Sequence, residues 1–298
     1  MNDSVGLPVG IVGLGNAGSA LASAFSGQRP LIGYDANPAR REAVAALDLQ
    51  WAGSAEEVAG LADTVVLSLP KPEASKAVVG ELLGGATPPK LIVETSTITP
   101  NTARDLGAIC AAASVEFIDA AVGSGVQAMA AGQVTFLVGG TDAAVAQARP
   151  VLELVAKTIH HLGPVGAGSG AKVVNNAVMH ALMVVLIEAG AMAGKLGIPM
   201  TALVDILGSA DGVSRPLQHR FRERILNGDY TGGMSVANAR KDSLLALETA
   251  ADCGVPLFAM LAAHTPYEIA ASQGMGDLDY AALAKLWEAW CDMDFSSG

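Results

Sequence analysis

The stretch that decides the fold is "PVGIVGLGNAG", residues 8–18. Its first half is a short apolar run rich in β-branched residues, which is typical of a buried strand. Its second half is a G-x-G-x-x-G motif, in which Gly13, Gly15 and Gly18 end the strand and open a helical pattern that continues through Phe25. Alone, a glycine motif is weak evidence for a binding site, because a chain with 34 glycines can contain it by chance. Placed between a strand and a helix, it predicts a dinucleotide-binding turn.

Each glycine of this turn has a separate expected role. Gly13 permits the tight turn, Gly15 lets the backbone approach a pyrophosphate, and Gly18 lets the helix pack closely on the strand. The pyrophosphate would then lie at the helix N-terminus, where free N–H groups favour an anion. We expect the whole turn to contact the cofactor: Gly13, Leu14, Gly15, Asn16, Ala17 and Gly18.

An acidic residue should follow at the end of the second strand, and Asp35 ends the apolar run 30–35. A carboxylate there can accept hydrogen bonds from ribose hydroxyls and would repel a 2′-phosphate, which favours NAD over NADP. The alternative is an ordinary turn aspartate. Arg40 and Arg41 follow closely and keep NADP open as the less favoured cofactor.

The first half of the chain alternates between strand and helix patterns, whereas the second half is helical. Beyond the stretches above, we expect strands at 62–70, 90–97, 115–122 and 134–140, and helices at 38–47 and 102–113. After residue 164 the expected helices are 169–196, 200–208, 214–226, 235–253, 257–273 and 279–292. The pattern predicts an α/β fold: an N-terminal Rossmann-type doubly wound, mostly parallel sheet in residues 1–163, followed by an all-helical C-terminal domain in residues 164–298.

Composition excludes several classes of protein. The net charge of −11 disfavours binding to nucleic acid. Cys110, Cys253 and Cys291 are far apart, so we expect neither a disulfide framework nor a metal site. No basic segment precedes the first apolar run, so we expect a cytoplasmic protein.

One apolar stretch, residues 177–194, is long enough to resemble a membrane span. Because it contains His180 and Glu188, we expect a buried helix between two domains and no membrane contact. Methionines along the helical half suggest more apolar surface than one domain can bury, which predicts a homodimer or homotetramer.

The segment "GSGAKVVNNAV", residues 168–178, begins this helix with an ammonium group and two amides. Lys172 and Asn176 are four residues apart and share one helix face, so both can face one ligand, with Asn175 as the second choice. A lysine desolvated between domains can have its pKa lowered enough for acid–base work. The alternative is a lysine that extends to solvent from an ordinary helix start. His180 lies on the same face and either lines the pocket or packs in the core.

A second cluster of charge is "SRPLQHRFRER", residues 214–224, which includes Arg215. It is either a solvated helix face, a subunit contact, or a docking site for an anionic group.

Taken together, the motifs resemble the β-hydroxyacid dehydrogenase family, which includes 3-hydroxyisobutyrate dehydrogenase. The resemblance rests on "GIVGLGNAG" and "VVLSLP", "ETSTITPNTAR" and "FIDAAVGSG", "GSGAKVVNNAV" and "RKDSLLALETA", in this order along the chain. It implies an oxidoreductase that transfers a hydride between the cofactor and the β-carbon of a small, anionic 3-hydroxy acid, or reduces the matching semialdehyde. Lys172 would be the general acid/base, and Asn176 would bind the substrate.

Further roles follow from the resemblance alone. It implies that Leu69, Pro70 and Ser96 contact the cofactor, and that Lys241 and the loop of Gly123, Ser124 and Gly125 contact the substrate.

The chain departs from the family pattern in that substrate loop. The family's Asp-Ala-Pro-Val-Ser-Gly-Gly is here Asp-Ala-Ala-Val-Gly-Ser-Gly, residues 119–125, so the proline is lost and serine and glycine are exchanged. Glu94 stands where aspartate is common in the family, and Ala17 stands where methionine is common. These changes leave the identity of the substrate open. Two other functions also stay open: an imine reductase on the same scaffold, whose members usually lack the lysine, and a non-catalytic dinucleotide sensor.

Overall fold

The computed structural model describes residues 7–297 as two compact units. Within the described residues these units are 7–177 and 178–297, and the division falls inside the long helix α8, Ala167–Lys195. A domain boundary before this helix, at residue 163, stays a prediction.

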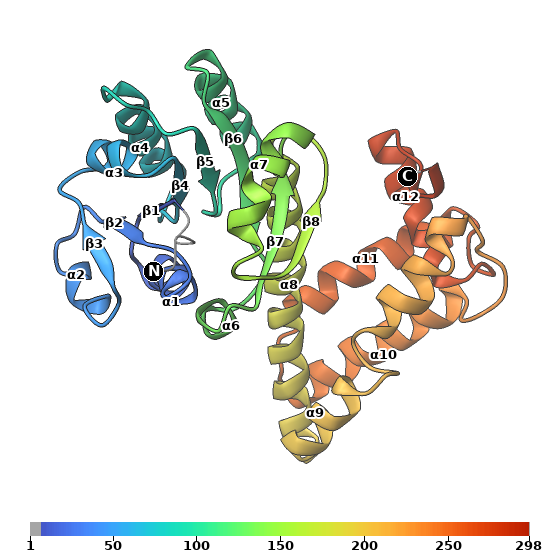
Figure 1. The fold of residues 1–298 in the computed structure, drawn as a ribbon. Helices are drawn as coiled ribbons and strands as arrows, with labels where there is room; N and C mark the ends of the chain where they lie inside the picture. Colours follow the sequence, from blue (N-terminus) through green and yellow to red (C-terminus); the bar gives the residue numbers. More distant parts are fainter. Residues whose placement is uncertain (1–6, 298) are drawn as a thin grey trace. The chain divides into compact units, whose positions relative to one another are not determined.

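The first unit is built on one eight-stranded sheet with the order β3-β2-β1-β4-β5-β6-β7-β8 (Figure 1). All neighbouring strands are parallel except β6 and β7, which are antiparallel. The strands are β1 Val9–Val12, β2 Leu31–Tyr34, β3 Leu49–Trp51, β4 Thr64–Leu67, β5 Leu91–Glu94, β6 Glu116–Val122, β7 Val134–Gly139 and β8 Ala156–His161. This is the doubly wound sheet that the sequence predicts.

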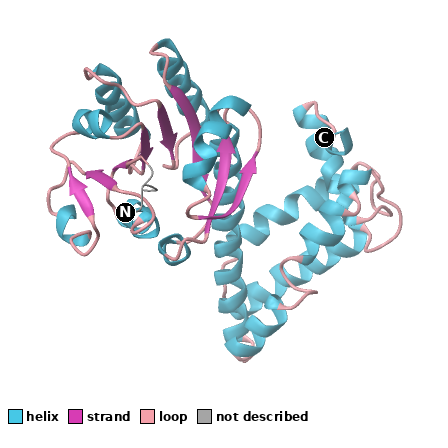
Figure 2. Cartoon of the chain, viewed as in Figure 1, coloured by secondary structure: helices cyan, strands magenta, loops and turns pink. Residues whose placement is uncertain are grey.

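Helices cover both faces of this sheet, because its central strands are apolar on both sides (Figure 2). In β1, Val9 and Ile11 pack into a core with α1 and α7, whereas Val12 packs into the opposite core with α3, α4 and α5. The helices of this unit before α8 are α1 Asn16–Phe25, α2 Arg40–Ala43, α3 Ala55–Leu61, α4 Pro72–Gly84, α5 Pro100–Ala112, α6 Val126–Ala130 and α7 Asp142–Leu152.

The strand order reverses at β1, which pairs with β2 on one side and β4 on the other. In open α/β sheets such a switch point leaves a crevice at the carboxyl ends of the strands, where ligands bind. The residues that follow β1 and β4 are therefore the ones that a ligand would meet first.

Both strands missing from the sequence prediction, β3 and β8, lie at the edges of the sheet. Edge strands are only partly buried and lack the continuous apolar run that marks central strands. The helix predicted over 38–47 is helical only at Arg40–Ala43. The turns that follow it lead into β3.

Helices make up the described part of the second unit, apart from one isolated bridge between Ser235 and Asp279. They are the end of α8, α9 Met200–Gly208, the π-helix η1 Pro216–Arg222, η2 Ile225–Asn227, α10 Val236–Cys253, α11 Phe258–Ser272, η3 Tyr280–Leu283, α12 Ala284–Cys291 and η4 Phe295–Ser297. The predicted helical second half is thus confirmed.

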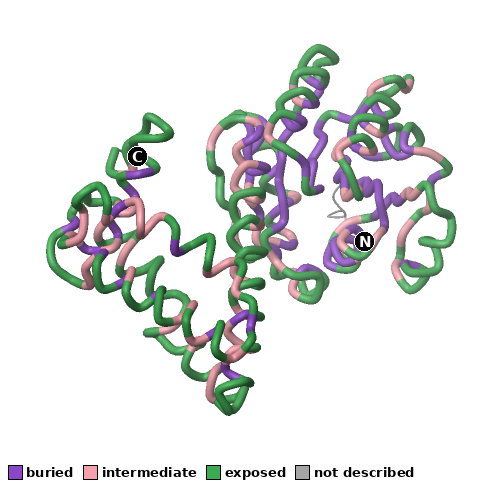
Figure 3. The backbone as a smooth tube through the Cα atoms, turned by 180° about the vertical axis from the view of Figure 1, so that it is seen from behind, coloured by how far each residue is buried: buried purple, intermediate pink, exposed green. Residues whose placement is uncertain are grey.

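The expectation that α8 is buried is wrong for a single chain. Figure 3 shows the helix as mostly exposed or half-buried, and its apolar side chains include Val178, Met183 and Ile187, each more than half exposed. By length and composition it could also cross a membrane. Glu188, by contrast, is buried, and its carboxylate accepts the N–H groups of Ala259 and Met260 at 2.8 and 3.2 Å. It thereby caps the first turn of α11.

Two arginines of the segment 214–224 stabilise the fold of the second unit. Arg220 and Arg224 both approach the fully buried carboxylate of Asp279, with Nε–O distances of 3.2 and 3.7 Å. Arg215 pairs with Asp211 on the surface at 3.0 Å. Because Arg220 and Arg224 neutralise a buried carboxylate, the alternative of a fully solvated face does not hold for them.

Candidate dinucleotide site and active site

The glycine turn after β1 has the geometry that its motif predicts. Gly13 has a φ of +92°, and a Cβ there would overlap the carbonyl oxygen of Ser68. A Cβ on Gly18 would overlap the carbonyl oxygen of Gly13, so helix α1 packs directly on the turn. Gly15 faces open space, with no atom within 4 Å of a Cβ position. Gly15 therefore leaves room for a ligand rather than meeting a packing need.

Asp35 fastens this turn to the end of β2. Its Oδ2 accepts the N–H of Leu14 at 2.7 Å, and its Oδ1 accepts the N–H of Asn37 at 2.8 Å. A carboxylate oxygen can accept more than one hydrogen bond, so both oxygens keep capacity for ribose hydroxyls.

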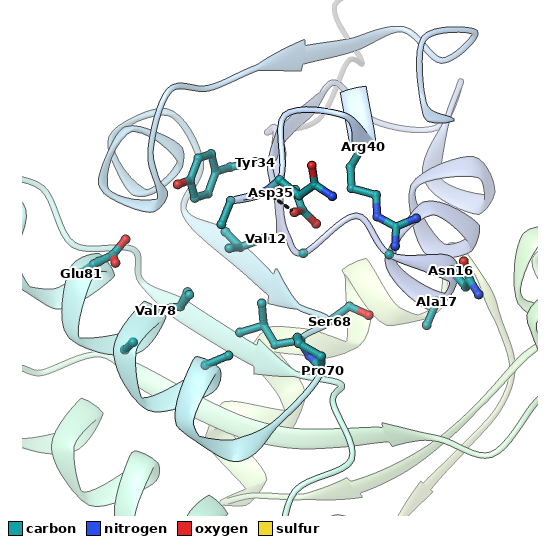
Figure 4. A pocket seen from close by; sticks show the side chains of 17 residues that line it. Val12, Asn16, Ala17, Tyr34, Asp35, Arg40, Ser68, Pro70, Val78 and Glu81 are labelled. Carbon is teal, nitrogen blue, oxygen red and sulfur yellow. Dashed lines mark hydrogen bonds between the residues drawn. The ribbon is translucent and has the colours of Figure 1, made fainter. Parts of the chain in front are cut away.

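The turn and Asp35 open onto a cavity of about 680 Å³ (Figure 4). Of the residues predicted to bind the cofactor, it is lined by Gly13, Gly15, Asn16, Ala17, Asp35, Leu69 and Pro70. The sequence prediction missed Tyr34, Val78 and Glu81, which also line it. Tyr34 directly precedes Asp35 and could have been found from that position, but Val78 and Glu81 lie on α4, and only the fold brings them to the cavity.

Only one of the two candidate arginines lines this cavity. Arg40 does so, and in the view of Figure 4 its side chain lies between Asp35 and Asn16. The Arg41 guanidinium instead lies over the Trp51 ring, 5.9 Å from its centroid.

A second cavity, of about 350 Å³, shares the wall of Ala17, Ser68, Leu69 and Pro70 with the first. It adds four predicted site residues: Ser96, Ser124, Gly125 and Lys172. Val126 and Met129 of α6 also line it and were not predicted, because nothing in a short apolar helix marks it as part of a site. The shared wall makes the two cavities neighbours, as a dinucleotide and its substrate require.

Ser96, which lines the second cavity, also holds the backbone of the shared wall by a hydrogen bond. Its Oγ accepts the N–H of Leu69 at 2.7 Å, and its own N–H donates to Oε1 of Glu94 at 2.8 Å. The backbone at Leu69 is thus held by a side chain from the next strand end.

The start of α8 is fixed to the sheet by a residue that the sequence prediction did not assign. The Asp119 carboxylate is fully buried and accepts the N–H groups of Gly166 and Ser169 at 2.7 and 2.6 Å. A Cβ on Gly168 would overlap the carbonyl oxygen of Leu137, so this turn of the helix packs directly on backbone. Residues i and i+4 share a helix face. Lys172 therefore lies on the same face of α8 as the glycine that packs on the sheet backbone.

Lys172 is half-buried, and burial lowers the pKa of its ammonium group. No ion pair involves it among the residues that the structure describes. Asn176, one turn later, is also half-buried, whereas Asn175 is exposed. The second-choice role of Asn175 therefore has less support than that of Asn176.

His180 and Lys241, two further candidate site residues, belong to the second unit. His180 is exposed, so it does not pack in the core of a single chain. Lys241 lies on α10, where its ammonium group contacts the neighbouring Asp242 at 2.9 Å.

The altered loop after β6 has a defined structure. The Ser124 Oγ accepts the N–H of Thr135 at 2.7 Å, while the exposed Gly123 donates its N–H to the Thr135 carbonyl at 2.8 Å. Ser124 thus extends the pairing of β6 with β7 by one side-chain hydrogen bond.

Fold and site together define an oxidoreductase of the nicotinamide-dinucleotide-binding class. Residues 8–163 match the sequence model of the NAD-binding domain of 6-phosphogluconate dehydrogenase, and residues 166–287 match that described as NAD-binding of NADP-dependent 3-hydroxyisobutyrate dehydrogenase. The chain belongs to the β-hydroxyacid dehydrogenase family.

Full-length relatives agree with this assignment. The 2-(hydroxymethyl)glutarate dehydrogenase of Eubacterium barkeri is 29% identical over 98% of both chains. The solved 3-hydroxyisobutyrate dehydrogenase of Mycobacterium tuberculosis with L-serine is 31% identical, with a TM-score of 0.65 over 94% of this chain and 99% of that one. An imine reductase from Pseudomonas sp., 20% identical with a TM-score of 0.84 over 94% and 98%, shares the fold. In the part of the chain that the structure describes, no group of three His, Cys, Asp or Glu could hold a metal ion.

Proposed function

We propose that this protein is an NAD-dependent dehydrogenase that oxidises a small 3-hydroxy acid at its β-carbon, or reduces the matching semialdehyde. The observation that carries the proposal is the position of Lys172: a half-buried lysine with a lowered pKa, in a cavity that shares a wall with the dinucleotide cavity. Oxidation of an alcohol needs a base next to a hydride acceptor, and this arrangement provides a place for both.

The residues of the first cavity fit a dinucleotide. Gly15 leaves open space beside the N-terminus of α1, where N–H groups favour a pyrophosphate. Asp35 keeps hydrogen-bonding capacity for ribose hydroxyls. A bound nicotinamide would supply the hydride acceptor in oxidation and the hydride donor in reduction.

In the direction of oxidation, Lys172 in its neutral form takes the hydroxyl proton of the substrate. In the reverse direction its ammonium group returns this proton to the carbonyl oxygen. Asn176 lies one turn further along and donates an amide hydrogen bond to the substrate without adding charge. The loop of Gly123, Ser124 and Gly125 binds the substrate carboxylate, since backbone N–H groups can hold an anion without a side chain. The Gly123 N–H already donates to the Thr135 carbonyl, so Gly125 supplies the backbone donor. For Lys241, whose ammonium group lies 2.9 Å from the Asp242 carboxylate, a substrate contact is proposed from the family resemblance alone.

NAD is the proposed cofactor because Asp35 would repel a 2′-phosphate. NADP is the second candidate, and Arg40 is the residue that favours it, since it lines the cavity while Arg41 lies over Trp51.

We also propose a cytoplasmic homodimer or homotetramer. Val178, Met183 and Ile187 of α8 and Phe258 of α11 are each more than half exposed, and a second copy could cover them. Glu188 argues against lipid around α8, because its buried carboxylate is committed to the N-terminus of another helix. Light scattering during gel filtration should show more than one chain per particle, and Phe258→Asp should reduce that number.

The test of the activity is reduction of NAD in the presence of 3-hydroxyisobutyrate, L-serine and 2-(hydroxymethyl)glutarate, the acids named for relatives. Turnover of any such acid supports the proposal. Reduction of a cyclic imine without turnover of hydroxy acids would favour an imine reductase. Cofactor binding with no turnover at all would favour a sensor.

A further inference from the structure

A fully buried carboxyl group lies directly behind the wall that the two cavities share. Glu94 ends β5, and its side chain has no exposed surface. Its Oε1 accepts the N–H of Ser96, and the Ser96 hydroxyl also lies within hydrogen-bonding reach of the carboxyl. The Ser96 Oγ in turn accepts the Leu69 N–H. Glu94, Ser96 and Leu69 thus form a chain that leads from the core to the cavity wall.

The other carboxyl oxygen of Glu94 lies near a hydroxyl group from α4, that of Ser75. Glu94 Oε2 and Ser75 Oγ are both fully buried, and neither has a hydrogen-bond partner of good geometry among the described residues. Ser75 lies close enough to affect the pKa of the Glu94 carboxyl. A proton on Oε2 would give this oxygen a donor function directed at Ser75, and both orphaned atoms would then be satisfied.

The surroundings favour that proton. Glu94 pairs in register with Asp119 on the neighbouring strand, so two carboxyl groups lie side by side at one end of the sheet. Asp119 is committed as an acceptor to two N–H groups at the start of α8. Burial and, to a lesser degree, the Asp119 charge raise the pKa of Glu94, while the Ser96 N–H and the nearby hydroxyls of Ser96 and Ser75 only partly offset this.

We propose that Glu94 is a positioning residue that stays a neutral carboxylic acid, with its Oε1 holding Ser96 and its Oε2–H directed at Ser75. Through Ser96 it fixes the backbone of Leu69, and hence the wall that faces the cofactor. The proposal rests on the proposed function only in that this wall contacts a nicotinamide dinucleotide.

The direct measurement is the infrared spectrum of the protein without cofactor. A protonated carboxyl has a carbonyl stretch that an ionised one lacks. We expect this band at neutral pH, its shift on ¹³C labelling of glutamate, and its loss in Glu94→Gln. Glu116→Gln is the matched control, because Glu116 is the exposed first residue of β6 and its change should leave the band in place.

The functional measurement is the binding of NAD and of NADP by calorimetry with no substrate present. Glu94→Ala leaves Ser96 N–H without its buried acceptor, and we expect the dissociation constant of the preferred cofactor to rise on the order of tenfold. Glu94→Gln keeps an acceptor oxygen for Ser96 and a donor for Ser75, so it should restore affinity to within about twofold.

Three results would overturn the proposal: no carboxylic-acid band in the unaltered protein at neutral pH, equal losses of affinity in Glu94→Gln and Glu94→Ala, or unchanged affinity in a folded Glu94→Ala. Since none of these measurements involves a substrate, they remain informative if the proposed oxidation of hydroxy acids fails.

Discussion

The carboxylate of Asp119 accepts the backbone N–H of Ser169 at 2.6 Å, fifty residues away in the sequence. This hydrogen bond and the matching one from Gly166 join the middle of β6 to the start of α8. Lys172 follows less than one turn later. Asp119 therefore anchors the start of the helix that carries the proposed base.

Replacing Asp119 with alanine should impair both stability and turnover. Two buried N–H groups would lose their acceptor, at a cost of about 1–3 kcal/mol each in the free energy of unfolding. The start of α8 would also lose its anchor, so kcat should fall more than cofactor affinity. Denaturant unfolding and steady-state kinetics measure the two effects. Asp142→Ala is the control, since that side chain is fully exposed, and an Asp119→Ala enzyme with normal kcat would show that Lys172 does not depend on this anchor.

Asp35 should determine the choice of cofactor. Asp35→Ala removes the repulsion of a 2′-phosphate and a ribose acceptor, and it also frees the N–H of Leu14. We expect weaker NAD binding, improved NADP binding and a smaller ratio of the two affinities, measured by titration of the unaltered and altered proteins. Asp48→Ala is the control, because this exposed carboxylate does not line the cavity. A natural preference for NADP would refute the assignment and point to Arg40.

The exchange of serine and glycine in the loop should influence substrate choice. Gly123 has room for a side chain, because a Cβ there would lie 3.5 Å from Thr135 Cγ2, an ordinary contact. Gly123→Ser combined with Ser124→Gly should therefore favour 3-hydroxyisobutyrate over bulkier acids when kcat/KM is compared across a panel. The single change Ser124→Gly controls for loss of the hydrogen bond to Thr135. If the ranking of substrates stays the same, the loop does not set specificity.

The pH dependence should follow Lys172. Burial lowers the pKa of this group, so the neutral base form appears at a lower pH than for an exposed lysine. For oxidation, kcat/KM should rise with pH and level off above that lowered pKa. For reduction, which needs the ammonium form, it should fall as the pH rises through the same value. Opposite profiles in the two directions are the expected signature, and two flat profiles would contradict the assignment.

The sequence was sufficient for the six inner strands of the sheet, the glycine turn and the helical second half, because each depends on local patterns. The turn at Gly13 needs a glycine whatever surrounds it, and the strand patterns of β1 and β4 are continuous apolar runs. The edge strands β3 and β8 escaped prediction, since partial burial removes the apolar signal.

The rest depends on contacts between distant parts of the chain. The hydrogen bonds of Asp119, the hydrogen bond between Leu69 and Ser96, and the capping role of Glu188 join residues tens of positions apart, so no local pattern predicts them. The burial of α8 was predicted wrongly because an apolar composition does not reveal what covers a helix. A second copy of the chain is the proposed cover.

The most direct test of the central claim is the turnover of Lys172→Ala with a hydroxy acid that the unaltered protein oxidises. Loss of a general acid/base costs on the order of 10² to 10⁴ in rate, and we predict a fall in kcat of that size. Cofactor affinity should stay near that of the unaltered protein, because the first cavity does not include this residue. Lys195→Ala, at the exposed far end of the same helix, is the matched control and should retain full turnover. A Lys172→Ala protein with near-normal kcat would contradict the proposal that this lysine carries the proton.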